Sequence, residues 1–175
     1  MPDEFPTLQV ALGGSVALLG WRLWLLLGAS RRLESDTARA ERALSSGNPP
    51  RGPERTGSAW LTPLLATAEH GRKRGSGPGE LEKAVGERAR REGARLRSRA
   101  GMDLVISAVL SGLLVYAAGA RLVVSFAFYL LGAIAIALLL ASAVVQVRGA
   151  RALSASGNRL ARAVARTLPS SGPAE

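Results

Sequence analysis

The most apolar stretch of the chain, residues 102–147, predicts two membrane-spanning helices that fold back on each other. As a single helix it would be about 69 Å long, more than twice the roughly 30 Å thickness of the hydrocarbon layer of a bilayer. After Asp103, its only charged residue is Arg121, which lies beside Gly119. A turn at residues 119–121 keeps this charge out of the hydrocarbon, and the pattern therefore predicts a transmembrane hairpin.

A further apolar stretch, residues 8–27, has the length of about 20 residues that one span requires. Asp3 and Glu4 precede it, and Arg31 and Arg32 follow it. A cleaved signal peptide would need a positively charged segment before a shorter apolar core. The pattern therefore predicts an uncleaved first span whose N-terminus lies outside.

The polar region that follows the first span, residues 29–101, begins with a helical pattern. Residues 31–44 carry interleaved Arg and Glu with apolar residues at helical spacing, and we expect them to continue the first span as one helix. Residues 45–58 are rich in Pro, Gly and Ser, a composition that predicts a linker.

Two further helices are predicted before the hairpin. Residues 59–70 have one apolar face, and Pro63 suits the first turn of a helix that starts near Thr62. The glycine-rich residues 71–79 interrupt the pattern. Residues 80–100 form the most regular polar helix, and no strong breaker separates them from the second span. We therefore expect this helix to run directly into the hairpin.

The C-terminal region, residues 148–175, is basic. Within it, residues 149–168 place Leu160 and Val164 opposite a set of arginines. This spacing predicts a basic amphipathic helix, which could lie on the inner leaflet or pack against the other polar helices.

The distribution of charge predicts the topology. Residues 29–101 contain 16 Lys and Arg against nine Asp and Glu, and residues 148–175 contain five Arg against Glu175. The positive-inside rule places both regions in the cytoplasm, with the N-terminus and the hairpin turn outside. The expected fold is an all-α, multi-pass membrane protein with three transmembrane helices (N-out, C-in) and long helices that extend into the cytoplasm. Its regions are residues 1–28, 29–101, 102–147 and 148–175.

Composition narrows the function classes. The 175 residues carry a net charge of +10 and no cysteine, which excludes disulfides, zinc fingers and thiol chemistry. His70 is the single histidine, and no metal cluster, nucleophile–base pair or phosphate loop is recognisable, so we expect neither an enzyme nor a bound cofactor. Few apolar residues remain outside the spans, and we expect no sizeable soluble core. Basic flanks with few aromatics favour anionic lipids over nucleic acid as a partner.

Arg22 interrupts the first span between Trp21 and Trp24. The favoured interpretation is an interface anchor: the two tryptophans mark the inner aromatic belt, and Arg22 extends towards lipid phosphates. The alternative is that Arg22 is a functional charge or an intersubunit contact.

Hydroxyl groups and small residues mark candidate pore or helix-packing positions in the hairpin. Each hydroxyl either bonds a carbonyl one turn back or lines a water-filled pore. Small residues four apart allow close helix packing, within the chain or between copies. The hydroxyl residues are Ser107, Ser111, Tyr116, Ser125 and Ser142; the small-residue faces are Ser107/Ser111 and Ala108/Gly112 in the second span, Ala133, Ala137 and Ala141 in the third, and Gly13, Gly14 and Ala17 in the first.

This layout of spans resembles the MotA/TolQ/ExbB proton-channel family, as a divergent, short member. Residues 80–99 are similar to the family's cytoplasmic helix. Residues 108–114 (AVLSGLL) resemble the start of the family's A-P-x-x-G-L-L-G-T-V stretch, whereas Val109, Val115 and Tyr116 stand where the family has proline, glycine and the pore threonine. In the third span alanine and isoleucine match the family pattern, and its threonine and proline are absent.

The resemblance implies a subunit of an ion-driven, energy-transducing complex in the bacterial inner membrane. Such subunits form homo-oligomers, as a rule pentamers, around a single-span partner whose membrane aspartate carries the proton. In this chain Asp103 stands only at the entrance of the second span, where it could cap the membrane helix. The alternative function is a non-conducting scaffold that binds lipid or a protein partner through its basic cytoplasmic helices.

Overall fold

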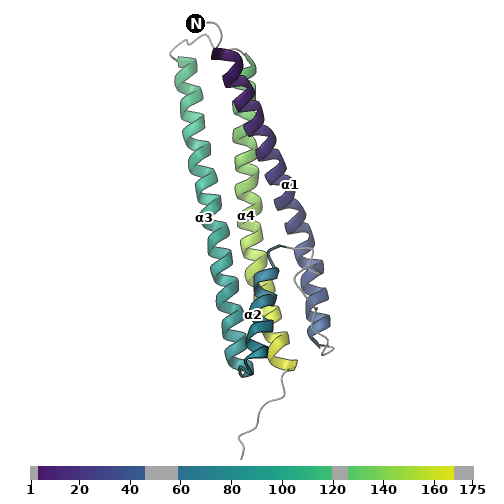
Figure 1. Ribbon diagram of the computed structural model, residues 1–175. Coiled ribbons are helices and arrows are strands. Elements are labelled where there is room, and N and C mark those ends of the chain that lie inside the picture. Colours follow the sequence, from purple (N-terminus) through teal and green to yellow (C-terminus); the bar gives the residue numbers. More distant parts are fainter. Residues whose placement is uncertain (1–3, 46–58, 120–125, 168–175) are drawn as a thin grey trace, which may run out of the picture. The chain divides into compact units, whose positions relative to one another are not determined.

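The computed structural model of the protein describes residues 4–45, 59–119 and 126–167. In this part of the chain 95 % of the residues are helical and there is no strand. Four helices follow one another (Figure 1): α1 (Glu4–Ser45), α2 (Thr62–Lys73), α3 (Pro78–Gly119) and α4 (Phe126–Thr167). The all-α prediction is confirmed.

Three of these helices are long and apolar enough to cross a membrane. The candidate spans lie within Val10–Ala43, Pro78–Gly119 and Phe126–Val164. This agrees with the prediction of a multi-pass membrane protein. The N-out, C-in orientation stays a prediction.

Each long helix joins an apolar half to a polar half without a break. α1 continues past Arg31 and Arg32, α3 includes both the polar residues 80–100 and the second span, and α4 includes the third span and most of its basic extension. The expected continuity is confirmed, because these segments hold no proline beyond the first helical turns and their single glycines do not interrupt a helix. Residues 46–58 of the predicted linker (45–58) and residues 120–121 of the predicted turn (119–121) lie outside the described residues, as does Ser125; Ser45 is the last residue of α1 and Gly119 the last of α3.

The short helix α2 starts where Pro63 predicts. Proline occupies one of the first positions of the helix, where a missing N–H removes no helical hydrogen bond. The connection from α2 to α3 contains Gly75 with a φ of +70°, a conformation that glycine adopts without steric cost.

The chain divides into two compact units, and each long helix contributes to both. Unit 1 comprises residues Met1–Leu27 and Arg97–Val147, and unit 2 comprises Gly28–Leu96 and Arg148–Glu175. The boundary in each helix falls close to the change from apolar to polar sequence.

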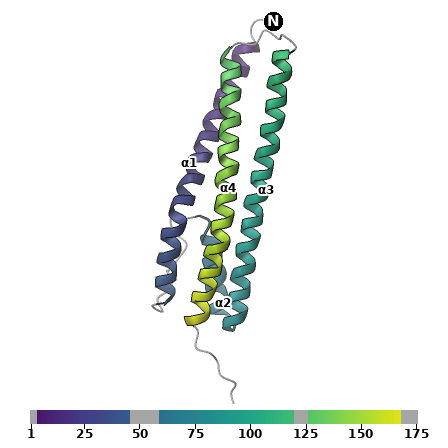
Figure 2. The same cartoon turned by 180° about the vertical axis from the view of Figure 1, so that it is seen from behind.

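Unit 2 has an apolar core, contrary to the expectation from composition. Figures 1 and 2 show α2 alongside the polar parts of α3 and α4. The expectation was wrong because alanine and well-spaced leucines suffice when long helices pack closely. The buried cluster contains Leu33, Ala40, Leu61, Leu64, Ala68, Leu81, Val85, Ala89, Leu96, Ala150, Leu153, Leu160, Ala161 and Val164. The basic C-terminal extension is thus a helix that packs against the other polar helices.

Two glycines of α4 allow the close approach of its neighbours in unit 2. A Cβ added to Gly157 would collide with the Cβ of Ala89 on α3, and one added to Gly149 would collide with the ring of Trp60. Since neither Ala89 nor a bulky indole can yield easily, both positions need the smallest residue.

In unit 1, α3 and α4 pack through a seam of small and polar residues. On α4 buried positions recur at spacings of three and four, as in a coiled coil, at Gly132, Ala135, Leu139, Ser142 and Gln146, and Ala143 beside Ser142 is buried as well. Of the predicted small-residue faces in the hairpin, Ser107 is buried, and Ser111 and Ala141 are half-buried. Ala108, Gly112, Ala133 and Ala137 are exposed, so a packing role for them between copies stays a prediction.

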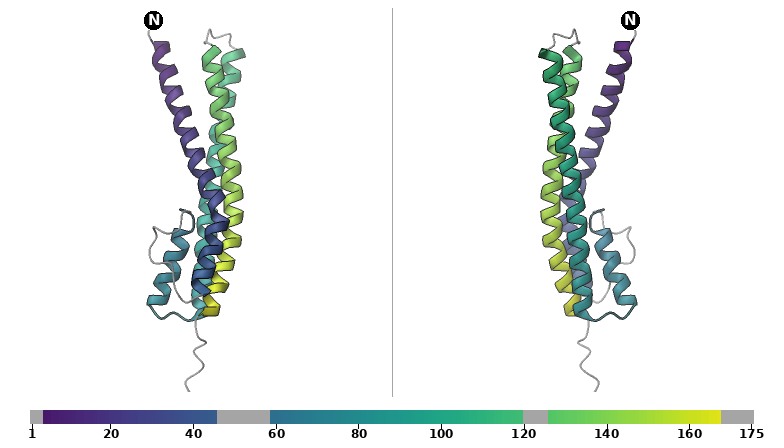
Figure 3. Two further views of the ribbon diagram at one scale, coloured as in Figure 1. Left: turned by 90° about the vertical axis from the view of Figure 1, so that its right-hand side faces the viewer. Right: turned by 90° about the vertical axis from the view of Figure 1, so that its left-hand side faces the viewer.

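The N-terminal part of α1 packs less closely in unit 1 than α3 and α4 do. Figure 3 shows it inclined away from the α3–α4 pair. None of the residues from Val10 to Leu27 is buried, and a Cβ on Gly13, Gly14 or Gly20 would meet nothing within 4 Å.

Candidate functional site

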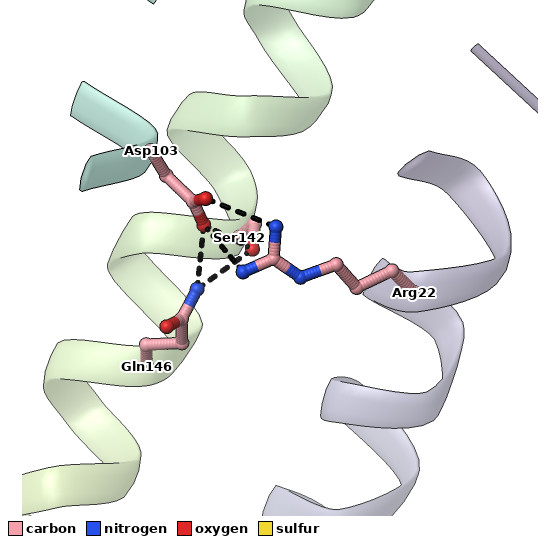
Figure 4. A network of polar contacts seen from close by, with 4 residues as sticks. All are labelled: Arg22, Asp103, Ser142 and Gln146. Carbon is pink, nitrogen blue, oxygen red and sulfur yellow. Dashed lines mark hydrogen bonds and ion pairs between the residues drawn. The ribbon is translucent and has the colours of Figure 1, made fainter. Parts of the chain in front are cut away.

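A charged side chain from α1 meets one from α3 inside unit 1. The Arg22 guanidinium donates two hydrogen bonds to the Asp103 carboxylate: Nη1 to Oδ1 at 3.0 Å and Nη2 to Oδ2 at 3.1 Å. This is a bidentate ion pair, the geometry in which arginine binds carboxylates most strongly. Figure 4 shows Arg22 reaching across from α1 to Asp103.

Two polar residues of α4 complete the network around Asp103. The Ser142 hydroxyl donates to Oδ2 at 2.8 Å, and Nε2 of Gln146 donates to the same oxygen at 2.6 Å. Gln146 Nε2 also donates to the Ser142 hydroxyl at 2.9 Å. Ser142 and Gln146 are one helical turn apart, so both face α3 (Figure 4). Two helices, α1 and α4, therefore supply donors to one carboxylate on a third, α3.

The ion pair is buried unevenly. The Asp103 side chain is 3 % exposed, whereas that of Arg22 is 41 % exposed. A buried carboxylate without partners would be very costly, and here four hydrogen bonds, two of them from a guanidinium, supply those partners. Asp103 is therefore fully engaged, while the guanidinium retains an accessible side.

Gln146 contributes a second polar atom to this site. Its Oε1 is buried and has no hydrogen-bond partner among the described residues. The amide is oriented by its two donated bonds, which leave Oε1 as an acceptor inside unit 1.

The predicted anchor residues on α1 differ in their surroundings. Trp21 and Trp24 are exposed and stack on each other, with ring centroids 5.2 Å apart. Their exposure agrees with an aromatic belt, which stays a prediction. Arg22 differs from the favoured interpretation, because its guanidinium contacts Asp103; its partial exposure still allows a lipid contact.

The predicted hydroxyl positions are not brought together. Ser107 is buried, and the Ser111 hydroxyl donates to the Ser107 carbonyl at 2.8 Å, as expected for a bond one turn back. Gly112 and Tyr116 are exposed, Tyr116 by 71 %. Ser125 lies outside the described residues. Ser142, grouped with these hydroxyls in the sequence, belongs instead to the Asp103 network.

Asp103 does not cap a helix, as the sequence suggested it could. α3 runs from Pro78 to Gly119, so Asp103 lies well inside it and its carboxylate bonds other helices. Gln146 was missed entirely. Two signals could have found the site: Arg22 and Asp103 are opposite charges in two apolar spans, and Gln146 lies one turn after Ser142 in a third.

The chemistry of this site is polar but not that of a metal centre. In the part of the chain that the structure describes, no three His, Cys, Asp or Glu side chains lie together as a metal site would require. The network can fix three helices relative to one another and can hold one negative charge within apolar surroundings.

Comparison of the chain with protein-family models, curated proteins and solved structures finds no match.

Proposed function

We propose that the protein is a bacterial inner-membrane subunit similar to the channel component of MotA/TolQ/ExbB ion-driven complexes. In this proposal several copies, as a rule five, surround a single-span partner, and the polar halves of the helices lie in the cytoplasm. The arrangement of three long helices, each with an apolar and a polar half, supports this function.

The hydrogen bonds of Asp103 support the proposal that the proton carrier lies in the partner. It is the only acidic residue in the described apolar spans, and it is already bonded to Arg22, Ser142 and Gln146. A proton-carrying carboxylate must be accessible to the proton path, whereas the Asp103 side chain is 3 % exposed and its oxygens accept four hydrogen bonds. The carboxylate that carries protons therefore comes from the partner, and Asp103 holds the subunit's helices together.

A second candidate is a scaffold that conducts nothing. The exposure of Tyr116, at the position of the family's pore threonine, favours it, because a phenol that is 71 % exposed is not enclosed among the helices of unit 1. In this function the basic helices bind anionic lipid or a protein partner.

Native mass spectrometry of the protein in detergent distinguishes the channel-type function from the scaffold function. The channel-type function predicts a discrete oligomer, five copies in the simplest case, that takes up a transmembrane peptide bearing an aspartate. A monomer or dimer that binds no such peptide contradicts it.

Proton flux in liposomes tests conduction itself. Flux through the oligomer with its partner should be lost when the partner's aspartate is changed to asparagine. Tyr116→Phe, with Tyr129→Phe as the matched control, tests the phenol: unchanged flux in both removes the Tyr116 hydroxyl from the mechanism. No flux under any condition favours the scaffold.

The orientation can be tested independently, because the chain has no cysteine of its own. Single cysteines at Ser154 and at Gly119 should react with an impermeant maleimide from opposite sides of the membrane. Labelling of both from the same side would contradict the N-out, C-in topology.

A further inference from the structure

The C-terminal end of α4 carries a stripe of three arginines in unit 2. Arg159, Arg162 and Arg166 are exposed and follow one another at spacings of three and four residues. With 3.6 residues per turn, they lie within an arc of about 60° on the helix surface. Leu160 and Val164 are buried on the adjacent face, so the stripe runs along the edge of the packed core.

The stripe forms one wall of a groove. The groove has a volume of about 320 Å³ and is lined by the three arginines, Ala163 and, from α1, Glu41. This volume is at the lower end of the range for small-molecule sites. Three cationic side chains and one carboxylate thus face one space.

Unlike several basic residues of unit 2, the three arginines have no acidic partner in the part of the chain that the structure describes. Arg88 and Arg95 pair with Glu92, and Arg91 pairs with Glu87. Within residues 4–45, 59–119 and 126–167, by contrast, no ion pair is formed by the arginines of the stripe. Arg162 donates through Nε to the Asn158 carbonyl at 3.2 Å, which orients its guanidinium and leaves both terminal nitrogens outside that bond.

The helix dipole explains only part of this arrangement. Basic residues are favourable in the last turn of a helix, and Arg166 lies there. Arg159 stands about two turns before the end, beyond the reach of that effect. Like charges three and four residues apart destabilise a helix slightly. A bound anion would therefore reduce the repulsion among the three arginines.

We propose that this groove binds the dianionic phosphate group of a small phosphorylated molecule. Glu41 lowers the formal charge of the lining from three positive charges to two, which matches a phosphate monoester and disfavours longer polyanions. A guanidinium group can donate two parallel hydrogen bonds to two oxygens of one phosphate, a geometry that lysine does not offer. Inorganic phosphate and phosphate monoesters share this chemistry. The site is independent of any role in ion conduction.

Isothermal titration of the full-length protein in maltoside micelles at constant ionic strength tests this site. Inorganic phosphate and glucose 6-phosphate are the probes, with chloride as the reference anion. We expect saturable binding of one ligand per chain, and a loss of affinity of about tenfold or more in Arg159→Gln and in Arg162→Gln, since each removes a charge-assisted hydrogen bond. Arg151→Gln, an exposed arginine of α4 outside the groove, should bind like the wild type.

The ester distinguishes the two sources of phosphate. Tighter binding of glucose 6-phosphate than of inorganic phosphate identifies a metabolite site, and the reverse order identifies a free-phosphate site. Glu41→Gln should shift the preference towards pyrophosphate, because it adds one net positive charge.

Three outcomes would overturn the proposal. These are titrations that do not saturate, an equal loss of affinity in Arg151→Gln, or binding only of a phosphoserine peptide and of neither small probe. Circular dichroism of each variant confirms that the helices are intact, so that a loss of binding reports on the groove.

Discussion

The two units expose opposite kinds of side chain along the same helix. In unit 1, α4 turns Gly132, Ser142 and Gln146 inward beside Ala135 and Leu139, while large apolar residues such as Phe126 are exposed. In unit 2, the same three-and-four spacing turns Leu153 and Leu160 inward, and arginines are exposed. The buried face of α4 is therefore stabilised differently in the two units. Burial of apolar side chains stabilises the polar half, whereas close packing and polar hydrogen bonds must hold helices that are surrounded by lipid.

The difference also shows in how α1 is attached. Its polar part buries Leu33 and Ala40 in the core of unit 2. Its apolar part buries no side chain from Val10 to Leu27, and its described hydrogen bonds to another helix are those from Arg22 to Asp103. The ion pair is therefore the main specific contact of the first span in unit 1.

Truncation of a buried leucine in the core of unit 2 should have the largest effect. Leu153→Ala removes a side chain that is 1 % exposed and should lower the free energy of unfolding by about 2–5 kcal/mol. Leu104→Ala in unit 1, 48 % exposed, should cost less than about 1 kcal/mol. The measurement is unfolding in mixed detergent micelles, followed by Trp60 fluorescence with Trp21 and Trp24 changed to Phe. Equal costs would remove the distinction between the units.

The next effect concerns the polar contacts of unit 1. Gln146→Met removes a hydrogen bond to the buried Asp103 carboxylate and should cost about 1.5–3 kcal/mol. Ser111→Ala is the matched control: its hydroxyl bonds a carbonyl of its own helix, so its removal should be nearly neutral. If both variants unfold at the same detergent fraction, the Asp103 network does not stabilise unit 1.

Glycine substitutions test where helices are in close contact. Gly157→Ala should destabilise unit 2 by about 1–3 kcal/mol, because its Cβ meets that of Ala89. Adding Ala89→Gly should restore part of the loss. In unit 1, Gly112→Ala meets nothing within 4 Å and should be neutral or slightly stabilising. A large cost for Gly112→Ala in the oligomer alone would place that face between copies.

The smallest effect is expected at an exposed pair on α2. Lys73 Nζ lies 2.9 Å from Glu69 Oε1, and this hydrogen bond lowers the pKa of the Glu69 carboxyl. Because the pKa is depressed in the folded state, the pair stabilises α2 above the unfolded pKa of glutamate and is lost as the pH falls through the folded value. Glu69→Gln should abolish this acid-side pH dependence with little change at neutral pH. An unshifted Glu69 pKa by NMR would contradict the pairing.

The helices were predictable from the sequence because their signals are local. Pro63 marks the start of α2, and the apolar stretches have the length of a span. The Asp103 network was not predictable from the sequence, because its members are far apart in the chain. Arg22 and Asp103 are 81 positions apart, and Asp103 and Ser142 are 39 positions apart. Spacing showed that Ser142 was polar within a span, but not which helix it faces. The core of unit 2 was missed because Ala89 and Gly157 contribute little hydrophobicity, yet allow the close packing that buries their neighbours.

The central claim is that the Arg22–Asp103 ion pair holds the first span against the hairpin. A double-mutant cycle with Arg22→Leu, Asp103→Leu and the double variant measures it most directly, with unfolding followed by Trp21 and Trp24 fluorescence in a Trp60→Phe background. Each single change leaves a charge without its partner, and Arg22→Leu should cost about 3–5 kcal/mol. The double variant should be more stable than the Arg22→Leu single variant, with a coupling of about 2 kcal/mol or more. Costs that simply add would contradict the claim.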